Sequence, residues 1–437
     1  MAQNAVANKK RKKRKFLNGI KGIGRFYLGN VRYGDTSFLF FVYVMILLGT
    51  GLVMMSSASY AWAFSKEGDG LFYAKAQAKN ILLGIVVMII FTGFDYHNFK
   101  FMRFGKSKKT FPTAIFLYLL GIVLLISTFF FGVDEGGSMG AKRWLVIGGF
   151  NFQPSEVAKF TLIIFLAYMI ELHHDKMYKL LNGIGINMIF IAVYAGLIVM
   201  EPHVSGTILV CIIGVSMIFC GDSNLKQIIV IASFVAVVGG IVIYSQAQDP
   251  ESYLSVRFKS WLHPFDDVLN DTWQTSNSLI AIGSGGLFGL GFGNSRQKYL
   301  YLPESQSDFV FSIVCEELGF VGAFAIILVF VLLIIEGYSI ASRCQDKFGC
   351  LIAVGITTQI AIQAIFNLCV VSNLVPNTGI SLPFFSYGGT AIIMQLMEMG
   401  IMLNISRKRY YPEKKDNDDK NKKKPSYNDD DDELMRA

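Results

Sequence analysis

The sequence predicts an all-α polytopic membrane protein with about ten transmembrane helices and a large extracellular loop between spans seven and eight. Of its 437 residues, 53% are hydrophobic and only 16% are charged, whereas soluble domains carry about a quarter charged residues. Apolar runs of membrane-spanning length recur along the chain. A soluble enzyme is therefore excluded, and a single membrane domain is predicted.

The predicted helices are the apolar runs long enough to cross about 30 Å of hydrocarbon. In chain order they lie near residues 37–56, 80–94, 111–131, 154–170, 181–200, 204–220, 227–245, 308–336, 348–371 and 385–404. The linker after the second run carries five Lys or Arg residues between 100 and 109. Because cytoplasmic loops are enriched in Lys and Arg, both termini are predicted to be cytoplasmic. The longest outer segments are then 57–79, 132–153 and 246–307.

The two ends of the chain differ from the ten-span domain predicted over residues 37–406. Residues 1–36 form a basic cytoplasmic segment, and the first 34 hold 10 Lys or Arg and no acidic residue. The first apolar run is longer than the ~7–15 residues of a signal-peptide core, so an uncleaved anchor is predicted. Residues 407–437 alternate basic and acidic blocks, which predicts a disordered cytoplasmic tail, with a docking role as the alternative.

Metal, disulfide and nucleic-acid sites receive no support. None of the six cysteines forms a CxxC pair, and His173-His174 lie in a charged linker without further ligands. The net charge of +8 belongs to the N-terminal segment, so no nucleic acid is predicted as a partner.

The segment 246–307 is the first place to look for chemistry, because loops of this length are uncommon unless they are functional. Its six glycines between 283 and 293 do not form G-x-G-x-x-G, and no βαβ pattern surrounds them. Close backbone packing at the membrane surface is the favoured interpretation, and backbone N–H groups binding a phosphate are the alternative. The mixture of apolar, glycine-rich and basic stretches predicts a folded, partly re-entrant loop.

Asp308 stands where this loop enters the eighth span. Partial desolvation there would raise the pKa of its carboxyl group, which suits a general base. The alternative is an N-cap, since Ser305-x-x-Asp308 also fits ordinary capping chemistry.

Charged residues inside spans are costly unless they are paired or face a cavity. Glu156 and Lys159 lie at i and i+3 after Pro154, which predicts either a mutual ion pair or the polar wall of a ligand cavity. Three further acidic residues are interpreted as members of structural pairs: Glu316, Glu317 and Glu398.

Five basic residues lie on the predicted outer side, against the positive-inside bias: Lys142, Arg143, Arg257, Arg296 and Lys298. They suggest an anionic ligand such as phosphate, with solvated loop charge as the alternative. The segment PNTGISLPFFSYGGT before the last span predicts either a broken helix end at an outward cavity or a plain connection.

Four long motifs resemble the SEDS family of FtsW, RodA and SpoVE, over roughly residues 37–406. They are GAKRWLVIGGFNFQPSEVAK (140–159), Trp261-Leu262-His263-Pro264 through IAIGSGGLFGLGFGNSRQKYLYLPESQSDF, EELG (316–319) and TGISLPFFSYGGT (378–390). Residues 54–59 favour the FtsW/SpoVE branch. The resemblance implies an inverting peptidoglycan glycosyltransferase that polymerises lipid II at the outer face of the bacterial cytoplasmic membrane, with a class B penicillin-binding protein as partner.

The same resemblance assigns roles to individual residues. Asp308 matches the acid of P-E-x-x-x-D-F, which is regarded as essential for catalysis, and Glu156 and Lys159 match the pair of Q-P-S-E-x-A-K, expected in a central cavity. The chain departs from the family at His203, where an acid usually follows the proline.

The expected chemistry needs one base and one cationic group. Asp308 would take the proton of the attacking sugar 4-hydroxyl, while outer-face Arg and Lys, or a divalent cation (Mg²⁺ or Mn²⁺) that the sequence does not show, would stabilise the departing pyrophosphate. The alternatives are a lipid II flippase, which needs charge through the full membrane depth, and a scaffold. The sequence does not distinguish division, elongation and sporulation.

Overall fold

The computed structural model describes residues 36–103, 110–133, 143–148, 150–201, 203–221, 223, 226, 229, 253–270 and 272–407. The predicted N-terminal segment before residue 36, the tail after Arg407 and the predicted span 227–245 therefore lie outside the described residues, apart from an isolated position within that span.

Long apolar helices dominate the described residues, as predicted. They are α2 (Phe38–Glu67), α3 (Phe72–Gly93), α4 (Thr113–Phe131), α5 (Pro154–Leu172), α6 (Ile186–Met200), α7 (Val204–Cys220), α11 (Val310–Ser342), α12 (Lys347–Val371) and α13 (Gly389–Ser406). Within the described residues, seven helices are long and apolar enough to cross a membrane. Nine of the ten predicted spans thus coincide with helices in the described ranges, and the all-α multi-pass fold class is confirmed.

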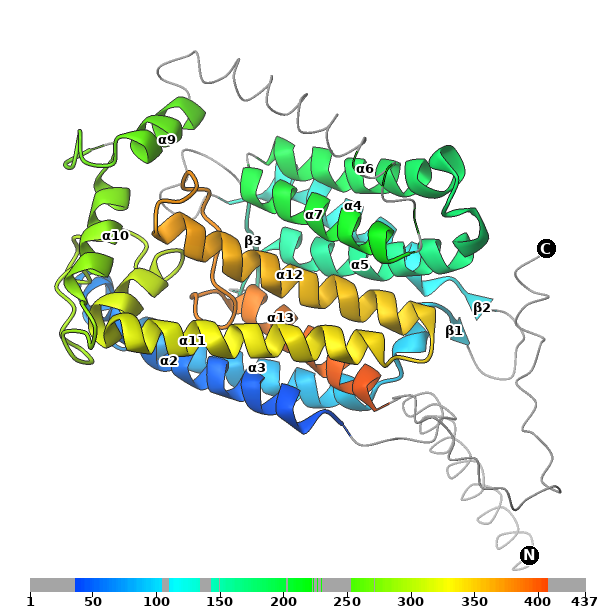
Figure 1. Ribbon diagram of the computed structural model, residues 1–437, viewed down its shortest axis with the longest axis horizontal. Coiled ribbons are helices and arrows are strands. Elements are labelled where there is room, and N and C mark those ends of the chain that lie inside the picture. The colour runs from blue at the N-terminus through cyan, green and yellow to red at the C-terminus, as the bar shows by residue number, and fades with distance from the viewer. Residues whose placement is uncertain are drawn as a thin grey trace, which may run out of the picture.

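The remaining elements are short. They are α9 (Tyr253–Leu262), α10 (Trp273–Ser284), η1 (Tyr96–Phe99), η2 (His174–Lys176), η3 (Leu180–Gly185) and the antiparallel pairs β1 (Met102–Arg103) with β2 (Thr110–Phe111) and β3 (Leu145–Ile147) with β4 (Phe150–Phe152). Figure 1 shows α9, α10 and the start of α11 at one end of the bundle, with β1 and β2 at the other. We call the first of these the Asp308 end.

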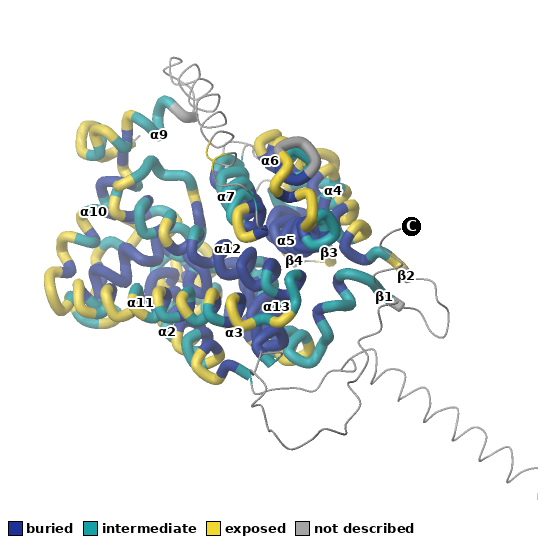
Figure 2. The backbone as a smooth tube through the Cα atoms, turned by 45° about the vertical axis from the view of Figure 1, so that its right-hand side comes forward, coloured by how far each residue is buried: buried dark blue, intermediate teal, exposed yellow. Residues whose placement is uncertain are grey.

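The core lies along α5, α12 and α13. In α12 and α13, 83% and 72% of the apolar window is buried, compared with 22–39% for the other candidate spans. Figure 2 shows α5 and α12 as largely buried helices, whereas exposed residues gather on the outer helices. Those exposed side chains include many large apolar ones, such as Leu82, Ile89 and Phe130, which suits contact with lipid. Polar residues of α5, α12 and α13 are consequently enclosed by protein.

One predicted outer segment is largely helical. Within residues 57–79, α2 continues to Glu67 and α3 begins at Phe72, so both helices extend beyond the predicted spans. Gly68 ends α2 in the left-handed conformation, with φ 72°. At 1.5 Å per residue, α2 is about 45 Å long and exceeds the hydrocarbon thickness. Falling hydropathy marked the end of the predicted span, but helical hydrogen bonds do not require apolar side chains, so the helix continues past it.

The other two predicted outer segments contain local structure. Within 132–153, the β3–β4 hairpin leads directly into α5, whose first residue is Pro154. Within 246–307, α9 and α10 pack at the Asp308 end. The predicted folded loop is therefore present in the described part of this segment.

Candidate active site

Asp308 lies two residues before the start of α11 and is partly exposed. The N-cap position of α11 belongs to Phe309, and no side chain caps that helix, so the capping hypothesis for Asp308 is wrong. A turn over 304–309 replaces the cap, because the Phe309 N–H donates to the Glu304 carbonyl at 3.2 Å. Among the described residues, nothing donates a hydrogen bond to the Asp308 carboxylate, which leaves it available for chemistry.

The surroundings of Asp308 raise the pKa of its carboxyl group to about 7. Burial is the largest cause, and the nearby Glu304 carboxylate adds to it, while Arg257 and Arg143 act in the opposite direction. A base with a pKa close to the working pH is the most effective at accepting a proton.

Two of the five predicted outer-side cations therefore lie within electrostatic range of Asp308. Arg143 donates from Nε to the Glu201 carbonyl at 3.3 Å. Arg257 on α9 donates from Nη1 to Gln274 Oε1 at 3.3 Å, which ties α9 to α10. Arg296 is exposed, and Lys142 lies outside the described residues.

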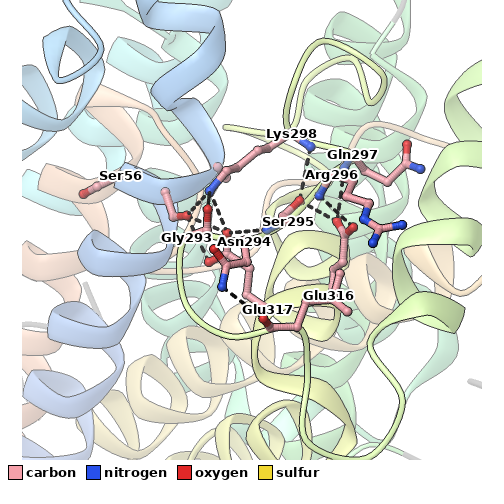
Figure 3. Close-up of polar contacts among 12 residues, drawn as sticks. Ser56, Gly293, Asn294, Ser295, Arg296, Gln297, Lys298, Glu316 and Glu317 are labelled. Atoms are coloured by element: carbon pink, nitrogen blue, oxygen red, sulfur yellow. Dashed lines mark hydrogen bonds and ion pairs between the residues drawn. The ribbon is translucent and has the colours of Figure 1, made fainter.

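Lys298 has a different role from the predicted one. It is buried, and its Nζ donates to Ser57 Oγ at 3.0 Å, to the Gly293 carbonyl at 2.6 Å and to Glu317 Oε1 at 2.9 Å (Figure 3). A lysine ammonium group has three donors, and all three are used. Lys298 is therefore not a substrate-binding residue; it stabilises the packing of its loop against α2 and α11. The predicted pairing of Glu317 is confirmed.

The glycine-rich stretch packs against α11 through its backbone. The N–H groups of Leu290 and Gly291 donate to the carbonyls of Glu316 and Glu317, both at 3.0 Å. Gly319 breaks the helical geometry of α11 with φ 67° and ψ −170°, and a Cβ there would lie 2.2 Å from the Gly289 nitrogen. Close backbone packing thus explains these glycines, and two of the N–H groups that the phosphate alternative could use are already bonded.

The Glu156 and Lys159 side chains form the predicted ion pair, with Nζ 2.8 Å from Oε1. Their side chains are only 8% and 5% exposed, so the pair faces protein rather than lipid. Glu398 on α13 lies within electrostatic range, and its two carboxylate oxygens accept hydrogen bonds from Gln359 Nε2 at 3.1 and 2.9 Å. Glu398 is therefore stabilised by an amide in addition to Lys159.

Comparison with known proteins decides the family. The model of the FtsW/RodA/SpoVE family, described as "Cell cycle protein", matches residues 37–411. The chain belongs to the FtsW/RodA/SpoVE family. It is 35% identical to the "Probable peptidoglycan glycosyltransferase FtsW" of Bacillus subtilis (strain 168), covering 85% of this chain and 90% of that protein. It is 36% identical to "Stage V sporulation protein E" of the same organism, covering 85% and 97%.

Solved structures support the same fold. One is a chain from a study of the structural coordination of polymerization and crosslinking by a peptidoglycan synthase complex, with TM-score 0.69 and 22% identity over 86% of this chain and 98% of that one. Another is the rod shape determining protein RodA of Thermus thermophilus, with TM-score 0.60 and 23% identity over 86% and 98%. The predicted family, on its FtsW/SpoVE side, is confirmed.

His203, at the departure from the family pattern, lies directly before α7. Burial is the largest cause that lowers the pKa of its imidazole, to about 3, and the positive charges of Arg143 and Lys159 lower it further. Its Nδ1 is buried and has no hydrogen-bond partner in the described part of the chain. The imidazole is therefore neutral at physiological pH. Two residues earlier, Glu201 provides a carboxylate that accepts from Thr128 Oγ1 at 2.6 Å.

Sequence reasoning missed the residues that hold the backbone at Asp308. Asn367 on α12 donates from Nδ2 to the Asp308 carbonyl at 2.7 Å. Gly379, with φ 69°, lies so close that a Cβ on it would be 3.2 Å from Asp308 Oδ2. A single Asn inside an apolar run carries no sequence signal that separates this role from ordinary helix packing.

Proposed function

We propose that this chain is a peptidoglycan glycosyltransferase that polymerises lipid II with inversion at the anomeric carbon. The observation that carries the proposal is the Asp308 carboxylate, which is free of hydrogen bonds from the described residues, has a pKa near 7 and lies near two arginines. Relatives at 32–35% identity named "Probable peptidoglycan glycosyltransferase FtsW" support this assignment.

The proposed chemistry follows from these groups. A sugar 4-hydroxyl loses its proton to an Asp308 oxygen as the hydroxyl oxygen bonds to the anomeric carbon of the donor. The bond from that carbon to the lipid pyrophosphate breaks, and the leaving group takes the electron pair. Arg143 and Arg257 stabilise the negative charge that develops on it.

A divalent cation, Mg²⁺ or Mn²⁺, is an alternative source of positive charge. In the part of the chain that the structure describes, no three His, Cys, Asp or Glu side chains gather in a group that could hold a metal ion. In the proposed steps, Arg143 and Arg257 supply this positive charge.

The direct test is polymerisation of purified lipid II by the purified chain in detergent, with and without a class B penicillin-binding protein. We expect glycan strands in detergent, where no membrane separates two compartments, and a higher rate with the partner. The main alternative is a lipid II flippase, and buried charges such as those of Glu156, Lys159 and Glu398 are the observation that favours it. Transfer of labelled lipid II across vesicles without strand synthesis would support the flippase and contradict the polymerase.

We further propose that the chain lies in the bacterial cytoplasmic membrane with the Asp308 end outside and both termini inside, because basic residues cluster in the 100–109 linker. Leu269, between α9 and α10, is 82% exposed. A Leu269→Cys chain should react with a membrane-impermeant maleimide in intact cells, whereas Ser342→Cys, at the exposed far end of α11, should react only after permeabilisation. The parent chain controls for the native cysteines, and the reverse pattern would refute this orientation.

A further inference from the structure

Asn367 on α12 is fully buried at the Asp308 end of the bundle. Its Nδ2 donates to two backbone carbonyls, those of Asp308 and Ile380, both at 2.7 Å. Carbonyl oxygens only accept, so both contacts require the NH₂ group, and the orientation of the amide is fixed by its partners. A single side chain thereby joins the turn before α11 to the segment before α13.

The joined segment is itself held in place. Asn377 accepts from the Gly379 N–H at 3.1 Å and donates to Gln274 on α10 at 2.7 Å. Gly379 has φ 69°, which favours glycine, and its missing side chain leaves space beside Asp308 Oδ2. The Asp308 carboxylate therefore lies directly against backbone whose position depends on Asn367.

We propose that Asn367 is a positioning residue that holds the Asp308 carboxylate against Gly379 in the geometry needed for proton transfer. This inference rests on the proposed function, in which Asp308 is the base. Asn367 does not itself touch the reacting atoms; it acts by fixing the backbone on both sides of the carboxylate. Small displacements of a reacting group are costly to rate, about 100-fold for 1 Å.

The remaining Asn367 atom, Oδ1, is buried and accepts no hydrogen bond from the described residues. Packing alone does not account for an amide with an unsatisfied acceptor, since a Leu of similar size would leave no such group. The presence of an amide at this position is explained by the two hydrogen bonds that its NH₂ group donates.

The chain offers a matched control in Asn404 on α13. Asn404 is also buried, donates from Nδ2 to a backbone carbonyl, that of Thr92 at 2.9 Å, and also leaves Oδ1 without a partner. It lies at the opposite end of the bundle, in the last turns of α13. A substitution at Asn404 therefore carries a similar structural cost without touching the base.

The charges that face Asp308 define the expected pH behaviour. They are Glu304 in the same turn, Arg257 on α9 and Arg143 before β3, while α12 and the segment before α13 contribute the amides of Asn367 and Asn377, which do not titrate. Asn367→Asp adds a like charge beside the base. It should move the acid limb of the kcat profile to higher pH, by about one unit.

The experiment measures lipid II polymerisation by the full chain with its partner, normalised to folded protein. We expect Asn367→Leu to lower kcat at least about tenfold with KM nearly unchanged, and Asn404→Leu to stay within about threefold of the parent. Asn367→Asp should shift the acid limb and Asn404→Asp should not, a readout that remains measurable if either variant folds poorly. Equal losses at 367 and 404, or an unmoved acid limb, would overturn the proposal.

Asp308→Asn in the same assay distinguishes a failure of the base assignment from a failure of the positioning role. If that variant is active, the assignment of the base fails. If it is inactive while Asn367→Leu retains the parent kcat, only the positioning role fails.

Discussion

Asp308→Asn is expected to lower the rate of lipid II polymerisation by about 10²–10⁴-fold while the chain remains folded and bound to its partner. Asn has nearly the same size as Asp but cannot accept the proton of the attacking hydroxyl. No loss of helix capping is expected, because Phe309 occupies the N-cap position of α11. Strand synthesis on gels and a thermal unfolding curve measure the two effects separately.

The activity of the parent chain should depend on pH through the protonation state of Asp308. With a pKa near 7, Asp308 is increasingly protonated as pH falls below 7, so activity should fall there. The contribution of Asp308 to folding stability changes with pH in the opposite direction to the activity. Its folded-state pKa lies above the unfolded value of about 3.9, so its contribution favours folding at low pH and is lost as pH rises towards 7. Asp308→Asn should therefore unfold at the same or a higher temperature than the parent at pH 8.

Asp266→Asn is a suitable control, because Asp266 is an exposed carboxylate in the same 246–307 segment as Glu304. It should leave both rate and unfolding temperature unchanged. An Asp308→Asn chain that polymerised lipid II at the parent rate would remove Asp308 from the mechanism.

Breaking the buried Glu156–Lys159 pair should give the second large effect, a loss of about 3–5 kcal/mol in unfolding free energy for removal of one partner. We expect Lys159→Ala to cost more than Glu156→Ala. Without Lys159, the carboxyl groups of Glu156 and Glu398 stay within electrostatic range of each other and lose the cation that attracts both, whereas without Glu156 the ammonium group can still attract Glu398. Thermal unfolding in detergent and the yield of folded protein measure the difference.

The charge swap tests whether the pair itself matters. Glu156→Lys with Lys159→Glu should recover only part of the stability, since Glu156 lies in the first turn of α5, where the helix dipole favours a negative charge. Lys75→Ala serves as the control, because Lys75 and Asp69 form a similar 2.6 Å pair that is solvent-exposed. If Lys159→Ala lowered the unfolding temperature no more than Lys75→Ala, the buried pair would not contribute to the stability of the fold.

The sequence by itself determined the class of the protein and the location of its chemistry. Hydropathy and the spacing of charges are local properties, so the apolar runs became helices and Asp308 was found at the boundary of a span. The Glu156–Lys159 pair was also predictable, because three residues along a helix bring two side chains to the same face. The motifs led to the family that the comparison confirmed.

Only the tertiary structure decided which charges serve the site and which serve the fold. Lys298 looked like a ligand for phosphate, but its donors are taken by residues on a loop and two helices, including Ser57, 241 positions away. Asn367 looked like any residue of an apolar helix, yet it holds the backbone of Asp308, 59 positions away. Sequence patterns reflect residues that are close together in the chain. Hydrogen-bond partners far apart in the chain depend on which helices pack side by side, and only the tertiary structure determines that packing.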